Sequence, residues 1–166
     1  DVYKRQDYLT GIGHREIGFF TGKEYIGENH LYPDYRKKVF IDYCDAHDLI
    51  YEPYIQEGVF QISSGYEMAC NLINGGKLPT AIFAASDPIA FGAIKAFTEH
   101  GIRVPEDISI VGFDDINMAQ FSAPPLTTVS APAYHMGMYG ASILQHLLRE
   151  HPGPCLLYTS DAADEL

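Results

Sequence analysis

The chain has 166 residues, with 11 Lys and Arg side chains against 22 Asp and Glu side chains, which gives a net charge of −11. An acidic protein of this kind is not expected to bind a nucleic-acid backbone through its own surface. The chain has no apolar run near the roughly 18–20 residues that span a bilayer and no secretory signal, so we expect a soluble cytoplasmic protein. Cys44 and Cys70 stand in helical patterns and are expected to be reduced, buried small side chains.

The two ends of the chain correspond to opposite strands of one short DNA element. The DNA sequence GATGTGTATAAGAGACAG encodes the first six residues, DVYKRQ, and its reverse complement, shifted by one base, encodes CLLYTS from Cys155 to Ser160. This element resembles the transposon-end adaptor used in sequencing libraries. We therefore expect residues 1–6 and 155–166 to be adaptor-derived, and the rest to be a piece of a longer reading frame.

Helical and strand patterns alternate through the first half of the chain. In chain order we predict the end of a helix at 8–14, a strand at 17–20, a loop up to Pro33, a helix from Asp34 to about 47, a strand at 54–57, and a helix to about 75 that Ser63 or Ser64 caps. The alternation indicates an α/β fold.

The second half contains a strand–helix–strand unit. Strands are predicted at 81–85 and 108–113, around a helix from Pro88 to about 100 with Asp87 as its N-cap and Gly101 at its end. Neither strand alternates polar and apolar residues, which is typical of a parallel sheet covered by helices on both faces. Residues 123–126 form a stiff Pro-rich crossover, and a last amphipathic helix is predicted at 134–149.

Polar side chains follow two of these strands directly. Ser86 and Asp87 come after one strand, and Asp114 and Asp115 come after the other. The ligand crevice of an open parallel sheet lies just outside the carboxyl ends of its strands, and carboxylates there could hold a polyhydroxylated or cationic ligand. The alternative is that Asp87 serves only as a helix cap and Asp115 only begins a turn.

Two further residues are candidates for the same site. Arg36 lies in the first turn of a predicted helix, where the helix dipole disfavours a cation, so its place is costly unless something uses the charge. Phe60 follows a predicted strand, where an aromatic ring could stack on a sugar ring or on a base. A solvated surface Arg36 and a Phe60 that only covers the core are the alternatives.

The motifs of several enzyme classes are missing from the sequence. There is no dinucleotide-binding G-x-G-x-x-G after a strand, no phosphate-binding loop and no G-x-S-x-G elbow. Cys44 and His47 have no second pair to complete a zinc site. Asp114 and Asp115 are adjacent, so their carboxylates would not converge on one bond. We expect no enzyme activity, no metal and no cofactor.

The strings PTAIFAASDPIAFGAIKAF, RVPEDISIVGFDD and PPLTTV, with GHREIGFF upstream, resemble the effector-binding core of the LacI/GalR family of bacterial transcription regulators. The resemblance implies a two-lobed, periplasmic-binding-protein-like fold, with 7–28 in the first lobe, 29–128 forming the second, nearly complete lobe, and 129–154 returning to the truncated first lobe. It also implies that Arg36, Phe60, Ser86, Asp87 and Asp114 bind a small effector, expected to be a sugar. The usual Gly of the family is Val39 here, which bears on how Arg36 reaches the cleft.

The resemblance further implies a repressor that contacts DNA only through a helix-turn-helix absent from this sequence. It implies a homodimer when the protein is complete, formed through the helix at 88–100 and its surroundings. The alternative is a secreted sugar-binding protein of a transporter, which shares the lobed design and would carry a signal peptide upstream. The sequence leaves open which sugar binds and whether it induces or co-represses.

Overall fold

A computed structural model describes residues 2–26, 30–32 and 35–150 of the chain, so the predicted cap Asp34 lies outside the described residues. The chain forms two compact units, residues 1–131 and 132–166. The second contains the amphipathic helix α5, Ala133–Glu150, close to the predicted bounds, on which Met138, Leu144 and Leu148 are about half exposed.

Among the described residues of the first unit, five strands make one sheet in the order β4-β1-β5-β6-β7, with every pairing parallel. The strands are β1 (Ile17–Gly22), β4 (Ile55–Gly58), β5 (Ala81–Ala84), β6 (Ser109–Asp114) and β7 (Thr127–Ser130). All residues of β1 and β5 are buried, as the apolar run predicted for β5. In β6, for which the same burial was predicted, only Ile110, Val111 and Gly112 are buried. Two short strands, β2 (Glu24–Ile26) and β3 (His30–Tyr32), pair antiparallel where a loop was predicted.

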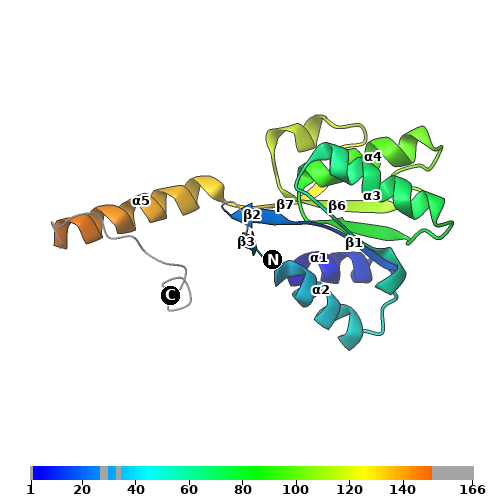
Figure 1. Cartoon of the computed structure of the whole chain (residues 1–166), viewed down its shortest axis with the longest axis horizontal. Coiled ribbons are helices and arrows are strands. Elements are labelled where there is room, and N and C mark those ends of the chain that lie inside the picture. Colours follow the sequence, from blue (N-terminus) through cyan, green and yellow to red (C-terminus); the bar gives the residue numbers. More distant parts are fainter. Residues whose placement is uncertain (1, 27–29, 33–34, 151–166) are drawn as a thin grey trace. The chain divides into compact units, whose positions relative to one another are not determined.

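Helices cover both faces of the sheet, as predicted, and the α/β fold is confirmed (Figure 1). α1 (Val2–Gly11) and α2 (Tyr35–Ala46) lie on one face, and α3 (Ile62–Asn74) and α4 (Asp87–Glu99) lie on the other. Two short 3-10 helices, η1 (Glu52–Tyr54) and η2 (Asn117–Phe121), precede β4 and follow β6.

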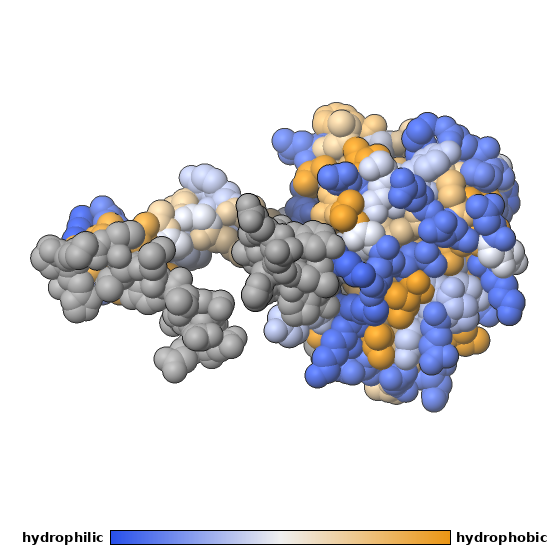
Figure 2. Space-filling view, in the orientation of Figure 1, coloured by the Kyte–Doolittle hydropathy of each residue, from blue (hydrophilic) through white to orange (hydrophobic). Residues whose placement is uncertain are grey.

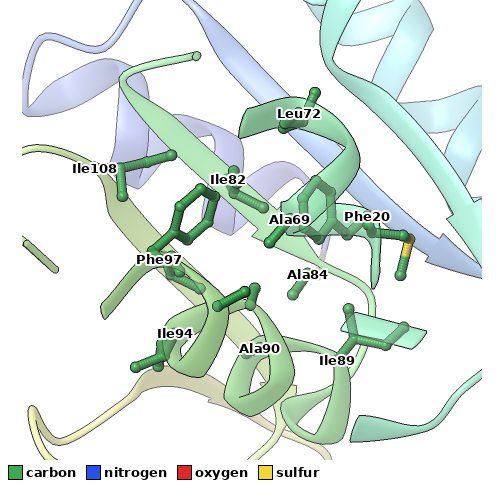
Figure 3. Close-up of a cluster of buried hydrophobic side chains, with 14 of the residues drawn as sticks. Phe20, Ala69, Leu72, Ile82, Ala84, Ile89, Ala90, Ile94, Phe97 and Ile108 are labelled. Atoms are coloured by element: carbon green, nitrogen blue, oxygen red, sulfur yellow. The ribbon is translucent and has the colours of Figure 1, made fainter. Parts of the chain in front are cut away.

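Each face of the sheet has its own hydrophobic core. On the α1/α2 side, Phe19 of β1 stacks on Phe40 of α2 with ring centroids 4.9 Å apart, and Phe83 of β5 lies 4.8 Å from Phe19. On the α3/α4 side, residues of β1 and β5 meet residues of the two helices (Figure 3), among them Phe20, Ile82, Ala84, Ala69, Leu72, Ile89, Ala90 and Phe97. Burial of one such large apolar side chain contributes about 1.5–3 kcal/mol, so the two cores hold the strand ends in fixed places.

Two glycines let α3 and α4 pack with their backbones in contact. A Cβ on Gly65 would lie 2.0 Å from the carbonyl oxygen of Ile89, and a Cβ on Gly92 would lie 1.9 Å from that of Ile62. Since real Cβ atoms do not approach other atoms so closely, neither position has room for a side chain. This contact fixes α4, whose first turn lies beside the cleft described below.

The predicted caps of α3 and α4 are wrong. The N-cap of α4 is Ser86, and Asp87 is the first residue of the helix, with Pro88 second. The N-cap of α3 is Gln61, without a side-chain hydrogen bond. Ser64 lies inside that helix, and its Oγ accepts a hydrogen bond from Val59 N–H at 2.9 Å. In both cases the side-chain oxygens bond to groups outside their own helix, Val59 for Ser64 and Ile116 and Thr128 for Asp87, which local spacing does not reveal.

Residues 7–28 and 29–128 were assigned to different lobes from the sequence. In the structure β1 lies between β4 and β5, so these two segments share one sheet and one compact unit. The reason is physical: parallel neighbours are joined by long crossovers, so the central strand of such a sheet can come first in the chain.

Hydrophilic residues predominate on the visible face of the first unit, and hydrophobic residues occur there in small separate groups (Figure 2). The larger exposed apolar side chains of this unit include Met118 and Phe121 of η2, which are 59% and 74% exposed. None of the helices within the described ranges is long and apolar enough to cross a membrane.

Candidate functional site

The carboxyl ends of the five parallel strands lie at one edge of the sheet. β1 comes first in the chain, and the next strand in sequence, β4, lies on one side of it in the sheet. The strand after that, β5, lies on the other side of β1. The strand order therefore reverses between β1 and β5, which is where ligands bind in open α/β sheets. The candidate site is at this edge.

A cleft of about 390 Å³ opens at this edge, lined by Arg36, Phe60, Ala85, Ser86, Pro88 and Asp114. Arg36 comes from the first turn of α2, Phe60 from the loop after β4, Ser86 from the end of β5 and Asp114 from the last residue of β6. Four of the five residues expected at the site from the sequence thus line the same cleft. The fifth, Asp87, is not among the lining residues.

Arg36 extends from α2 across the end of the sheet. Its Nη1 donates a hydrogen bond to the carbonyl oxygen of Ala85 at 2.9 Å. Its guanidinium carbon lies 5.1 Å from the ring centroid of Phe60 and 5.9 Å from that of Phe113, within the range of a cation–π interaction. Arg36 is therefore held on the cleft wall rather than spread on the surface, with a planar donor group suited to hydroxyl or carboxylate oxygens.

Phe60 covers the core and also faces the cleft. It packs against both hydrophobic cores and is partly buried. Its ring lies against Gly22 at the end of β1, where an added Cβ would be 2.6 Å from a ring carbon. Phe60 therefore covers part of the core, as one of the two sequence interpretations expected, and it also lines the cleft.

The hydroxyl of Ser86 is buried and unsatisfied. Ser86 is 5% exposed, and its Oγ has no hydrogen-bond partner among the described residues. An unsatisfied buried polar group costs about 1–3 kcal/mol, so each such group calls for an explanation. A ligand hydroxyl or amide in the cleft would supply the missing bond.

Asp114 lies in a strained turn at the end of β6. Its φ is +109°, and that of Asp115 is +56°, both in the region that non-glycine residues rarely adopt. Such strain persists only where the surroundings impose it, and it clusters at functional sites. The turn brings the half-buried Asp114 to the cleft while Asp115 stays exposed.

Asp87 lies behind the cleft, with no exposed surface. Its Oδ2 accepts a hydrogen bond from Ile116 N–H at 2.9 Å, and its Oδ1 accepts one from Thr128 Oγ1 at 2.5 Å. The carboxylate is therefore directed at the turn after β6 and at β7. Neither the cap role nor direct lining of the cleft, both considered from the sequence, describes this side chain.

A charged cluster that sequence reasoning missed lies at the ends of β1 and β4. Glu57 Oε2 is 2.9 Å from Lys23 Nζ, and Glu57 Oε1 pairs with Lys37. Hydrogen bonds from Lys37 and then Lys23 lower the pKa of the Glu57 carboxyl below its ordinary value. The three residues are far apart in sequence, so no local signal could have identified the cluster.

In the part of the chain that the structure describes, no group of three or more His, Cys, Asp or Glu side chains is placed to hold a metal ion. Cys44 and His47, the pair noted in the sequence, belong to no such group among these residues. Cys44 is buried, and burial raises its pKa to about 12, so it stays a thiol.

Residues 6–158 match the family of periplasmic binding protein-like domains. The chain is 38% identical over 143 residues to the HTH-type transcriptional repressor PurR of Haemophilus influenzae, covering 86% of this chain and 41% of that protein. It spans about two fifths of the length of the curated relatives it matches.

Two solved structures of regulators have the same fold. The lac repressor dimer bound to operator and the anti-inducer ONPF is similar with a TM-score of 0.78 and 28% identity, over 90% of this chain and 50% of that one. A sugar-binding LacI-family transcriptional regulator from Escherichia coli, complexed with phosphate, is similar with a TM-score of 0.72 and 32% identity, over 81% and 48% of the two chains. By their names these relatives are transcriptional regulators, the class of protein that the sequence led us to expect. The chain belongs to the periplasmic binding protein-like family, and within it to the effector-binding domains of LacI-family transcriptional regulators.

Proposed function

We propose that the cleft at the carboxyl edge of the sheet binds a small effector of a repressor, and that this effector is a sugar. The observation that carries the proposal is the convergence of Arg36, Phe60, Ser86 and Asp114, from four separate elements, on one cleft of about 390 Å³. We also propose that the whole protein acts in the cytoplasm, as a bacterial repressor does, and that it contacts DNA through a helix-turn-helix and not through the residues of this sequence.

The chemistry of the four side chains suits a sugar. Arg36 offers several donors, Asp114 offers acceptors, and the unsatisfied Ser86 hydroxyl can donate or accept. The ring of Phe60 suits the apolar face of a pyranose. One of the similar structures, from Escherichia coli, is itself described as a sugar-binding regulator, which supports the same class of ligand.

The test is a ligand titration of the 166-residue chain. Binding is monitored through the NMR signals of the backbone amides around the cleft. The probes are D-galactose, D-glucose and D-ribose, with adenine and hypoxanthine as the comparison, because an aromatic platform also stacks on a base. We expect a sugar to shift the signals of Phe60, Ser86 and Asp114. Shifts produced by the bases and by none of the sugars would show that the effector class is wrong.

Substitution of Asp114 tests the site itself. We expect Asp114→Ala to weaken binding of the sugar by about 1–3 kcal/mol, the range for a hydrogen bond to a charged group. Asp42→Ala is the matched control, since Asp42 is exposed on α2 and does not line the cleft. An unchanged affinity for Asp114→Ala would remove this residue from the site.

We also propose that the protein forms a homodimer through α4 and its surroundings, as the resemblance implied, and that the exposed η2 belongs to this surface. Met118 and Phe121 of η2 are among the most exposed apolar side chains of the first unit. Sedimentation equilibrium at rising concentration should show self-association that Phe121→Ser weakens. Tyr35→Ser is the control, because Tyr35 is 66% exposed at the start of α2. Equal effects of the two substitutions would argue against this surface.

A further inference from the structure

We infer that Asp87 is a positioning residue for the cleft: it fixes the strained turn after β6 and so holds Asp114 in place, without contacting the effector. The inference rests on the proposed function of the cleft. It concerns a fully buried carboxylate adjacent in sequence to Ser86, which does line the cleft.

The turn needs an external constraint. Asp114 and Asp115 both have positive φ, +109° and +56°, and neither is a glycine. A backbone of this kind relaxes unless surrounding groups impose its conformation. A relaxed turn would change the position of Asp114 in the cleft that it lines together with Arg36 and Ser86.

Two hydrogen bonds supply the constraint through Asp87. Ile116 N–H, directly after the strained pair, donates to Asp87 Oδ2 at 2.9 Å. Thr128 Oγ1 of β7 donates to Asp87 Oδ1 at 2.5 Å, and the same hydroxyl accepts a long hydrogen bond from Asp115 N–H at 3.4 Å. The amides of Asp115 and Ile116 are therefore both tied to one acceptor network centred on Asp87.

The space for this network is provided by Gly112 of β6. A Cβ on Gly112 would lie 2.3 Å from Asp87 Oδ1 and 3.0 Å from a methyl carbon of Leu126. Only glycine lets the carboxylate pass β6 to reach Thr128. Asp87 itself starts α4, which the close contact with α3 holds in place, so the network has a rigid base.

Amide hydrogen exchange of the 166-residue chain tests the inference without a ligand. We expect Asp87→Ala to speed exchange at Asp115 and Ile116 by about tenfold or more relative to the buried amides of β5, the scale for loss of one hydrogen bond to a charged group. Asp87→Asn keeps the shape and one acceptor oxygen, so its effect should be smaller. The inference would be overturned if Asp87→Ala increased the exchange rates of the Asp115 and Ile116 amides no more than those of the β5 amides.

Gly112→Ala provides a second variant, because it displaces the carboxylate while leaving Asp87 in the sequence. We expect the same local rise in exchange at Asp115 and Ile116. If Asp87→Ala does not fold, Gly112→Ala alone decides the question. Faster amide exchange at Asp115 and Ile116 supports the inference, and an unchanged exchange rate there overturns it.

A double-mutant cycle of Asp87→Ala and Asp114→Ala separates positioning from direct contact. The probe is whichever of D-galactose, D-glucose or D-ribose binds the wild-type chain. We expect Asp87→Ala to weaken binding about tenfold alone and to add little in the Asp114→Ala background, since it acts through Asp114. Additive losses would show that Asp87 acts on the sugar independently. If no sugar binds, the proposed effector class fails, whereas the exchange measurements still decide the role of Asp87.

Discussion

Thr128 donates a hydrogen bond to the buried carboxylate of Asp87, with 2.5 Å between Thr128 Oγ1 and Asp87 Oδ1 across 41 residues of sequence. This bond joins the edge strand β7 to the first turn of α4. Because the chain leaves the first unit shortly after β7, at Ala131, the bond also anchors the exit of the chain from that unit.

Thr128→Val removes the donor and keeps the shape of the side chain. We expect it to lower the free energy of unfolding by about 1–3 kcal/mol, because a buried carboxylate is left with one donor fewer. Urea denaturation followed by circular dichroism measures the change. Thr128→Ser retains the hydroxyl and should stay close to wild type; equal losses for the two variants would assign the effect to packing instead.

Gly22→Ala should displace Phe60 from the cleft wall. The new Cβ would lie 2.6 Å from the Phe60 ring, and the partly buried ring can move where a backbone could not. We expect binding of the sugar to weaken by about tenfold, or 1.4 kcal/mol, while the chain stays folded. Gly11→Ala, which meets nothing within 4 Å, is the control in the same titration. Wild-type affinity in Gly22→Ala would show that the ring does not support the sugar.

Gly92→Ala should destabilise the first unit severely. The added Cβ would meet the backbone oxygen of Ile62 at 1.9 Å, so α3 and α4 must separate. Overpacking of this kind costs typically about 1–3 kcal/mol and more when backbone has to move.

In contrast, Gly137→Ala in α5 meets nothing within 4 Å and should stabilise that helix by up to about 1 kcal/mol. Thermal denaturation measures both variants: the melting temperature should fall in Gly92→Ala and should not fall in Gly137→Ala.

His14 should make stability depend on pH below neutrality. Its Nδ1 lies 2.8 Å from Thr80 Oγ1 and its Nε2 lies 3.1 Å from Ser109 Oγ, which links the starts of β5 and β6. Thr80 donates its own proton to Glu16 O at 3.1 Å, so His14 Nδ1–H donates to Thr80 and the neutral Nε2 accepts from Ser109. Burial lowers the pKa of His14 in the folded chain below its ordinary value of 6.5.

The unfolded chain therefore binds a proton at His14 more readily than the folded chain does. Stability from the neutral ring is fully present above pH 6.5 and is lost as pH falls through the lower folded pKa. We expect the urea concentration at the unfolding midpoint to be lower at pH 5.5 than at pH 7.5. In His14→Gln the midpoint should change less with pH. The lowered pKa of Glu57 acts in a separate window, because its stabilising effect is lost only as pH falls below its ordinary 4.5. An unchanged slope in His14→Gln would assign the pH dependence to other groups.

The sequence by itself was enough to predict the order of the helices and of the sheet strands β1, β4, β5 and β6, and the edge at which the cleft opens, but it did not predict the edge strand β7. Apolar runs without alternation predicted β5 and β6 as parallel strands, and the ends of these runs located Ser86 and Asp114; the predicted burial holds throughout β5 and only in the middle of β6. Arg36 could be added because a cation in the first turn of a helix is costly unless its charge is used, and Phe60 because it follows a predicted strand; the family resemblance implied both. Local spacing is sufficient here because parallel strands all end on one side of a sheet.

Only the tertiary structure decided where Asp87 points, how β1 is placed and which charges meet at Glu57. Asp87 bonds to groups 29 and 41 residues away, and the strained turn at Asp114 is held by those bonds. The direction of a side chain just past a strand end depends on which distant donors the fold brings to it. Sequence periodicity describes each element separately and carries no information about such partners.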